Sequence, residues 1–180
     1  MRIIGGKHKG RKLKTFDGQD IRPTADRAKE ALFNILSTSV MGADFLDLCA
    51  GTGSVGIEAY SRGANSVTFV DASNKSLALA KENAKSIGLI EEFVLSKAED
   101  YVKRANKPFD IIFFDPPYAF NDIKLVLQGV LYNNLLKQGG IFIYERGKDK
   151  QPEEVTGFSL YQSRRYGIAV FDFYKTEGSL

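Results

Sequence analysis

The stretch FLDLCAGTGSVG at residues 45–56 decides the fold of this chain, because a short apolar run leads directly into a glycine-rich turn. Glycine lets the backbone turn sharply and approach a ligand closely, and a helix after such a turn presents unpaired N–H groups. Asp71 ends the next apolar run, 20 residues after Gly51, where a carboxylate can accept hydrogen bonds from ribose hydroxyls. The stretch therefore predicts a nucleoside site at the carboxyl end of a parallel sheet.

The glycines by themselves leave three interpretations open. Gly51, Gly53 and Gly56 have the G-x-G-x-x-G spacing of dinucleotide sites, which does not separate NAD from S-adenosylmethionine. They could also serve only to form a tight strand–helix turn. The position of Asp71 favours a ligand site over a purely structural turn.

Short apolar runs alternate with amphipathic segments on both sides of this stretch. The runs expected to be strands are 45–49, 66–70, 93–95, 109–114 and 140–144, and the segments expected to be helices are 54–62, 74–87, 97–105 and 122–136. This alternation predicts an α/β fold with a parallel sheet covered on both faces. Lys137–Gly140 has the composition of a helix C-terminus closed by glycine. The β-rich runs 158–166 and 168–174, separated by Gly167, predict an antiparallel hairpin that completes the sheet.

Positive charge is concentrated at the N-terminal end. Residues 1–29 carry nine Lys or Arg and three acids, whereas the other 151 residues carry 16 bases and 19 acids. A localised basic segment is typical of a surface that binds a polyanion, although it could equally be a solvated face. We expect residues 1–40 to form a basic extension and residues 41–180 the ligand-binding domain, together one compact unit.

Two elements are expected within this extension. Ile3–Leu13 predicts a short hairpin, and Thr24–Ser37 predicts a helix that Thr24 caps, with apolar residues at helical spacing. We expect both elements to lie over the carboxyl edge of the sheet.

Several classes of protein are disfavoured by composition. No apolar run approaches the roughly 20 residues of a membrane helix, and MRIIGGKHKG lacks the apolar core of a secretory signal. The single cysteine, Cys49, cannot form an internal disulfide, which fits a cytoplasmic location, and core packing is a better interpretation for it than a nucleophile. His8 lies among lysines, so we expect it at the surface, and no ligand set is spaced for a metal.

The tetrapeptide DPPY at residues 115–118 indicates the chemistry. Its two prolines stiffen the chain and fix the Asp115 carboxylate and the Pro116 carbonyl, which are both hydrogen-bond acceptors. Two fixed acceptors can hold both protons of an exocyclic base amine, turn its lone pair toward a methyl donor and stabilise the positive charge that grows on nitrogen. Tyr118 can stack on an extruded base. Hydride transfer needs no such arrangement, so S-adenosylmethionine is favoured over NAD.

These segments resemble a known family. FLDLCAGTGSVGIEA, FVDAS and FFDPPY look like the motifs of class I amino-methyltransferases, and MRIIGGKHKGRKL, RPTADRAKEALFNIL and RRYGIAVFDFY are similar to its RsmD-type branch, the bacterial 16S rRNA guanine-N2 methyltransferases. The resemblance spans nearly the whole chain. It implies a seven-stranded, mostly parallel Rossmann-like sheet with an antiparallel last strand. It also implies methylation of the N2 of a guanine in 16S rRNA. We expect the substrate to be a small subunit or an assembly intermediate and the enzyme to be a monomer.

The resemblance also implies roles for individual residues. The cofactor-binding residues would be Asp47, Gly51, Thr52, Gly53, Asp71, Ala72, Ala98 and Asp115, with Arg22 and Thr24 from a lid that also contains Pro23 and Arg27. The catalytic residues would be Asp115, Pro116 and Tyr118. From the basic cluster beside such a site, we expect the RNA-binding residues to be Lys7, Lys9, Arg11, Lys12, Arg27 and Arg165.

Three positions stay open. Lys97 stands where family members often have an acid that meets the adenine amine, so that contact must come from the Ala98 backbone, Glu99 or elsewhere. Glu145 could hold a nearby arginine or face the site. The segment 164–166 could touch RNA or the cofactor, or be an ordinary strand end.

Other functions remain as alternatives. The nearest is methylation of an adenine or cytosine amine in DNA or another RNA, although 180 residues leave little room for a separate DNA-recognition region. Methylation of a protein side-chain amide fits the basic N-terminus poorly. A non-catalytic RNA-binding module is disfavoured by the intact Asp71 and DPPY, and an NAD-dependent oxidoreductase is the most distant alternative.

Overall fold

The structure is a computed structural model that describes residues 1–16, 23–117 and 119–178. For residues 23–25 it describes the backbone alone. Its strands are β1 (Asp44–Leu48), β2 (Ser66–Asp71), β3 (Glu92–Leu95), β4 (Phe109–Phe114), β5 (Leu136–Gly147), β6 (Phe158–Tyr166) and β7 (Ala169–Thr176). Its helices are α1 (Pro23–Leu36), the 3-10 turn η1 (Ser37–Val40), α2 (Ser54–Ser61), α3 (Asn74–Lys85), α4 (Ala98–Arg104) and α5 (Ile123–Tyr132).

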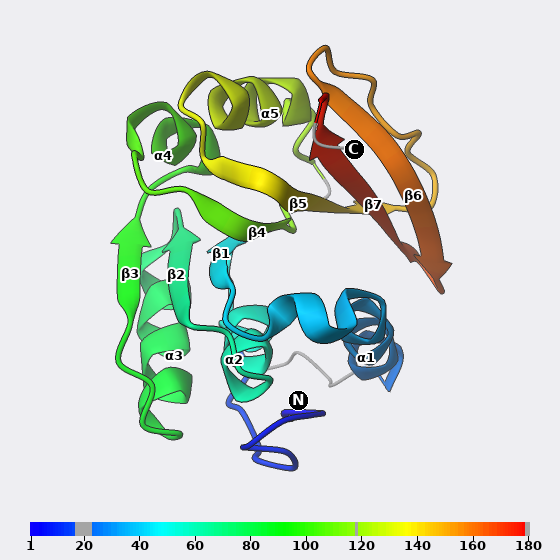
Figure 1. The fold of residues 1–180 in the computed structure, drawn as a ribbon. Coiled ribbons are helices and arrows are strands. Elements are labelled where there is room, and N and C mark those ends of the chain that lie inside the picture. The colour runs from blue at the N-terminus through cyan, green and yellow to red at the C-terminus, as the bar shows by residue number, and fades with distance from the viewer. Residues whose placement is uncertain (17–22, 118, 179–180) are drawn as a thin grey trace.

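The strands form one seven-stranded sheet in the order β3-β2-β1-β4-β5-β7-β6 (Figure 1). The first five strands in this order pair in parallel, and β7 runs antiparallel to both β5 and β6. The predicted α/β fold with a C-terminal hairpin is therefore confirmed. Gly167, at φ +63°, lies in the two-residue turn between Tyr166 and Ala169, where a positive φ suits a tight hairpin.

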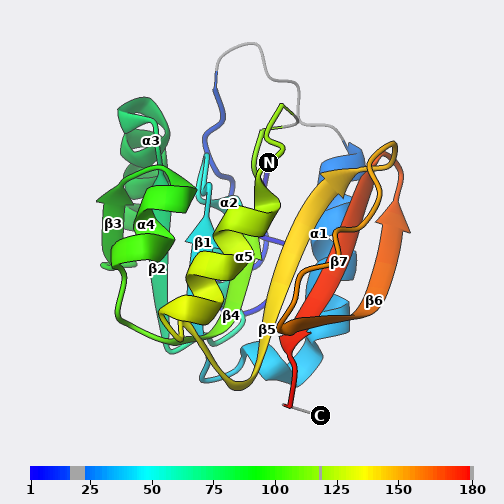
Figure 2. The same ribbon diagram turned by 90° about the horizontal axis from the view of Figure 1, so that it is seen from above.

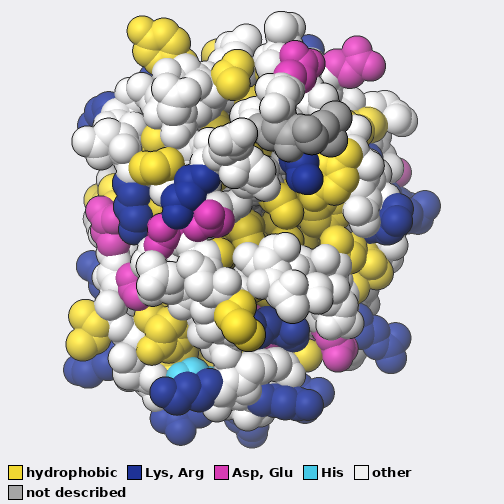
Figure 3. Space-filling model, in the orientation of Figure 1, with side chains coloured by type: hydrophobic (Ala, Val, Ile, Leu, Met, Phe, Trp, Pro, Cys, Tyr) yellow, Lys and Arg dark blue, Asp and Glu magenta, His cyan; other side chains and the backbone are white. Residues whose placement is uncertain are grey.

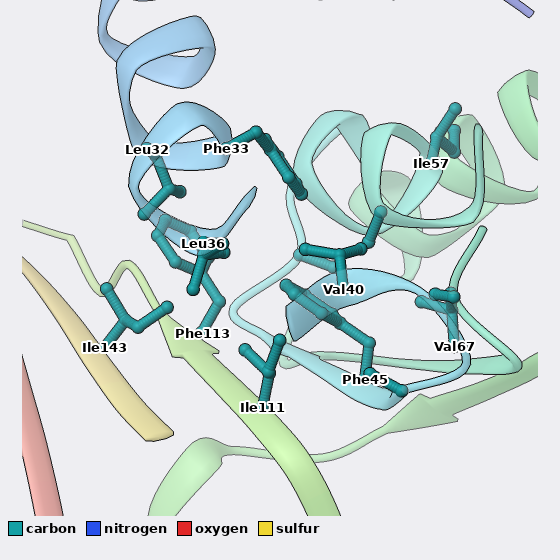
Figure 4. Close-up of a cluster of buried hydrophobic side chains, with 14 of the residues drawn as sticks. Leu32, Phe33, Leu36, Val40, Phe45, Ile57, Val67, Ile111, Phe113 and Ile143 are labelled. Carbon is teal, nitrogen blue, oxygen red and sulfur yellow. The ribbon is translucent and has the colours of Figure 1, made fainter. Parts of the chain in front are cut away.

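Helices cover both faces of the sheet, with α1, α2 and α3 on one side and α4 and α5 on the other (Figures 1 and 2). The first face is buried by large aromatic residues such as Phe45, Phe69 and Phe113, and α1 adds Leu32 and Phe33 (Figure 4). The second face has its own cluster around Phe114. Each fully buried large apolar side chain contributes about 1.5–3 kcal/mol, so these two layers hold the strand ends in place.

The segment Lys137–Gly140 does not end a helix, as its composition had indicated, but lies within β5. Helix α5 ends earlier, at Tyr132, because Asn134 takes the left-handed conformation at φ +50°. The N–H of Leu135 then bonds to the carbonyl of Val130, and that of Asn134 to Leu131, which is the Schellman pattern. Asparagine here does what glycine usually does, which is why the composition was misleading.

Helix α1 also differs from the expectation. It begins at Pro23, so Thr24 lies inside the helix and does not precede it as a cap. Most of α1 packs on a face of the sheet through Leu32, Phe33 and Leu36, and only its first turns reach the carboxyl edge. The predicted N-terminal hairpin is present as one antiparallel bridge between Arg2 and Lys12.

The N-terminal segment is fixed to α2 by the buried carboxylate of Glu58. The N–H groups of Ile4 and Gly5 each donate to Glu58 at 2.8 Å, and the Lys29 Nζ lies 3.6 Å from the same carboxylate. Gly6 has φ +75°, and a Cβ there would lie 1.8 Å from the Ser61 carbonyl oxygen, so only glycine fits. Residues 1–13 are thereby held against the body of the protein. No helix in the described part of the chain is long and apolar enough to cross a membrane.

Candidate active site

A cavity of about 800 Å³ lies at the carboxyl ends of β1, β2, β4 and β5. Its walls come from the strand ends and their loops, from Met1 and Phe16, from the first half of α1 and from the turn between β6 and β7. Cavities of this size hold drug-sized or nucleoside-sized ligands. Segments from both ends of the chain therefore enclose the site that the glycine loop and Asp71 had indicated.

The glycine turn after β1 opens toward the cavity. Gly51 has φ +54°, and a Cβ built on it would meet no protein atom within 4 Å, so this side of the turn is free to approach a ligand. Gly53 has φ +75° but packs against Ala80 of α3 and does not line the cavity. Gly51 thus serves the ligand side of the turn, and Gly53 serves helix packing.

Asp71 holds this turn in place. Its carboxylate accepts the N–H of Gly51 and the N–H of Ser73, each at 2.8 Å. A carboxylate oxygen has two lone pairs, so each oxygen keeps one for a further donor such as a ribose hydroxyl. The half-buried Asp71 lines the cavity with its orientation set by the backbone.

Asp47 is a buried carboxylate, 2% exposed, that accepts the N–H of Gly56 at 2.8 Å. Burial, together with the negative charges of Asp115 and Asp71, raises the pKa of Asp47 to about 8. A Cβ on Gly56 would lie 2.4 Å from the ring of Phe69, so this position needs glycine. Asp47 therefore anchors the first turn of α2 as well as lining the cavity.

Cys49 is half-buried, lines the cavity and has the strained backbone φ of +69°. Burial, with the nearby Asp71 and Asp115 carboxylates, raises the pKa of its thiol to about 12. The thiol is therefore protonated at neutral pH, which does not suit a nucleophile.

Asp115 and Pro116 follow β4 directly and both line the cavity. The Asp115 N–H bonds to the carbonyl of Leu48 at 3.3 Å, which fixes the start of the DPP segment beside the glycine loop. Pro116 is buried, whereas the Asp115 side chain stays open to the cavity. Burial by the surrounding protein raises the pKa of Asp115. Tyr118 lies outside the described residues.

Glu145 faces the same cavity, which decides between its two interpretations. The neighbouring Arg146 is paired with Asp172 at 2.5 Å, so no arginine is left for Glu145 from that position. Burial and the charge of Asp115 raise the pKa of Glu145. Two carboxyl groups from adjacent strands therefore share one wall of the site.

Sequence reasoning found the turn between β6 and β7 only in part, because it left open whether 164–166 reaches the cofactor and did not single out the residues that follow. Tyr166, Ile168, Ala169 and Phe171 line the cavity although they lie about 100 residues after Asp71. Tyr166 packs on Phe171, with ring centroids 5.9 Å apart. The sequence offered one signal, which is the large apolar residue Ile168 beside the hairpin glycine. In the structure its side chain is 47% exposed, so the core does not need it.

The remaining predicted site residues are placed as follows. Thr52 and Ala72 line the cavity, whereas Ala98 is buried in the apolar cluster under α4. Arg22 and the side chain of Thr24 lie outside the described residues. Arg27 is exposed on α1, and Arg165 is exposed on β6, where its Nε donates to the Gly167 carbonyl.

The basic residues of the N-terminal segment do not line the cavity but form an exposed surface. The four cations predicted to bind RNA here are all exposed, and Arg2 is exposed as well; the four are Lys7, Lys9, Arg11 and Lys12. Figure 3 shows Lys and Arg side chains gathered along the lower edge of the molecule around the one histidine, where this segment runs in Figure 1. His8, which we expected at the surface, is half-buried there and stacked on Tyr60, with ring centroids 5.9 Å apart.

The residues that line the cavity suit S-adenosylmethionine. A fixed carboxylate, Asp71, is available for a ribose, and the open side of Gly51 leaves room for close approach of a ligand. Among the described residues, no three His, Cys, Asp or Glu side chains are grouped as a metal site.

Comparison with known proteins gives concordant results. A family model described as "Conserved hypothetical protein 95" matches residues 1–175. The chain is 34% identical to "Ribosomal RNA small subunit methyltransferase D" of Haemophilus influenzae, over 97% of this chain and 93% of that protein. It is 35% identical to "Putative rRNA methyltransferase YlbH" of Bacillus subtilis, over 99% of this chain and all of that protein.

A solved structure has the same fold throughout. "Putative methyltransferase yhhF from Escherichia coli" superposes with a TM-score of 0.88 at 30% identity, covering 98% of both chains. The agreement extends over the N-terminal segment and the C-terminal hairpin as well as the central sheet.

Proposed function

Because the chain belongs to the family described as "Conserved hypothetical protein 95", that of the RsmD-type methyltransferases, we propose that it transfers a methyl group from S-adenosylmethionine to the exocyclic N2 of a guanine in 16S rRNA. One observation carries the proposal. The Asp115 carboxylate and the buried Pro116 line the same cavity as Asp71 and Gly51, so amine acceptors and a nucleoside site lie together.

The donor would lie along the glycine loop. S-adenosylmethionine supplies a methyl group on a positively charged sulfur, which is a strong electrophile. Asp71 would accept hydrogen bonds from the ribose hydroxyls, and Ala72 would lie beside the adenine. Gly51 and Thr52 would approach the methionine part, while Arg22 and Thr24 would belong to a lid at the entrance. The acidic residues around the cavity have raised pKa values, and a cationic ligand bound there would stabilise their charged forms.

The acceptor would lie on the other side, against the DPP segment. The Asp115 carboxylate and the Pro116 carbonyl would accept the two protons of the amine, which turns the nitrogen lone pair out of conjugation and toward the methyl group. The same oxygens stabilise the positive charge that grows on nitrogen as the bond forms. The methylated nitrogen is acidic, so its proton leaves afterwards and Asp115 need not be a strong base. Tyr118 would stack on the extruded base.

The RNA backbone would follow the exposed basic surface of the N-terminal segment. Residues 1–40 would act as an RNA-binding extension of residues 41–180, with Arg27 and Arg165 as further phosphate contacts. Lysine and arginine at such a surface bind phosphates without reading sequence. A small ribosomal subunit or an assembly intermediate is the substrate we favour, methylated by a monomer in the cytoplasm.

The proposal is tested by methylating defined substrates. Purified protein and S-adenosylmethionine with a radiolabelled methyl group are incubated with naked 16S rRNA, with 30S subunits from a strain lacking this enzyme, and with DNA. Nucleoside mass spectrometry should find N2-methylguanosine in 16S rRNA, and primer extension should locate it. Label in adenine, in cytosine or in DNA alone would contradict the proposal. Calorimetry should show binding of S-adenosylmethionine and none of NAD.

A further inference from the structure

We propose that Glu145 is a specificity residue for the acceptor base, whose carboxyl group accepts the N1–H of the target guanine while Asp115 and Pro116 hold the N2 amine. This inference rests on the proposed function, because it names how that same site would distinguish guanine from other purines.

Strand register places Glu145 beside Asp115. Phe114 of β4 pairs in parallel with Tyr144 of β5, so the next residues, Asp115 and Glu145, are neighbours across the two strands. Side chains alternate between the faces of a sheet. Phe113 and Ile143 point into the cluster under α1 and α2, so Asp115 and Glu145, two residues further on, point to that same face.

The carboxyl group of Glu145 is available to a ligand. Within the described part of the chain it makes no hydrogen bond and no ion pair, although its side chain is only partly exposed and its pKa is raised by burial. Its oxygens are not fully buried, so they remain open to a ligand that enters the cavity. Arg146, its neighbour in sequence, is fully engaged with Asp172 on the other face of the sheet.

Apolar surfaces enclose this part of the cavity. Tyr166, Ala169 and Phe171 from the β6–β7 hairpin lie on the same side as Glu145, which pairs directly with Phe171 across β5 and β7. These apolar side chains can contact the faces or the edge of a purine. They also keep water away from a hydrogen bond between Glu145 and the edge of the base. A polar contact in this setting discriminates strongly between ligands.

The chemistry of guanine fits two adjacent carboxyl groups. Its N2 amine and its N1–H are neighbouring donors on one edge, whereas adenine has an unprotonated N1 at that position. An oxygen of Glu145 would therefore accept the N1–H of guanine, and a purine that lacks this hydrogen would not make the bond. Asp115 presents the amine for methylation, and Glu145 selects the base that carries it.

The test compares two acceptor bases that share the 2-amino group. Once the modified position is mapped, 30S particles are reconstituted from 16S rRNA carrying either guanine or 2-aminopurine there, the latter lacking N1–H. We compare kcat/KM on the two particles for the wild-type enzyme, Glu145→Ala and the larger apolar variant Glu145→Leu. Glu154→Ala, at an exposed position away from the cavity, is the matched control. Calorimetry with S-adenosylmethionine verifies that each variant is folded and loaded.

The wild-type enzyme and the Glu154 variant should prefer guanine, and both Glu145 variants should lower that preference at least tenfold by losing rate on guanine alone. An equal loss on both bases, or no loss on either, would overturn the role of Glu145. A wild-type enzyme without preference would overturn it as well. Failure of the wild-type enzyme to methylate the guanine particle would instead refute the proposed function.

Discussion

Replacing Asp115 by alanine should abolish most turnover without weakening the fold. Within the described residues its carboxylate makes no hydrogen bond or ion pair, and its side chain is open to the cavity, so the substitution removes little packing. It also removes one negative charge beside Asp47 and Glu145, whose pKa values that charge helps to raise. We therefore expect the melting temperature of Asp115→Ala to equal or exceed that of the wild-type protein.

The expected loss of rate follows from what the carboxylate would do in the transition state. Removing one preorganised hydrogen-bonding group from developing charge typically lowers kcat by about 10²–10³, or roughly 3–4 kcal/mol. Asp71 and Gly51 would be untouched, so the Kd for S-adenosylmethionine should change by less than about twofold, well under 1 kcal/mol.

A single-turnover methyl-transfer assay, calorimetry and a thermal melt on the same preparation separate these effects. Asp100→Ala removes an equally exposed carboxylate from α4, outside the cavity, and serves as the control. Near-normal turnover of Asp115→Ala would refute the role of this residue. A parallel loss of turnover, cofactor binding and stability would refute the claim that its role is confined to the transferred group.

Three further predictions concern pH, packing and salt. Because its pKa is raised, Asp115 loses its charge as the pH falls through that value, so kcat/KM should fall on the acid side. Glu145→Gln removes a neighbouring acidic group and should move this fall to lower pH. A pH–rate profile that does not move would contradict an electrostatic interaction between Asp115 and Glu145. Gly6→Val should lower the free energy of unfolding by more than about 2 kcal/mol in urea denaturation, because its φ is positive and a Cβ meets backbone. Equal stability would show that the N-terminal segment is not held as described. Replacing three exposed cations by alanine should flatten the salt dependence of RNA binding by up to about 0.9 per lost phosphate contact, measured by filter binding; an unchanged slope would exclude this surface. These cations are Lys9, Arg11 and Lys12.

The sequence was sufficient to predict those parts of the site that depend on local order. Gly51 and Asp71 are placed by the strand–turn–helix pattern around them, and Asp115 by the end of an apolar run. In a parallel sheet all such ends meet at one edge, so the cavity followed from the alternation of strands and helices.

The features that sequence reasoning did not find depend on contacts between distant segments. Glu58 looked like an ordinary helix residue, yet it accepts hydrogen bonds from the backbone N–H groups of Ile4 and Gly5. These residues lie 54 and 53 positions earlier in the chain. The orientation of Glu145 required the register of β4 and β5 and the pairing of Arg146 with Asp172. The turn at Tyr166 reaches the cavity only because β7 inserts between β5 and β6. No local pattern encodes these arrangements.

The most direct measurement is a crystal structure with S-adenosylhomocysteine and an RNA fragment that contains the target guanine. We expect the oxygens of Asp115 and Pro116 to face the space in front of the sulfur, with the purine amine between them. Oxygens that point away from the sulfur, or a cavity too small for a purine in front of it, would contradict the account.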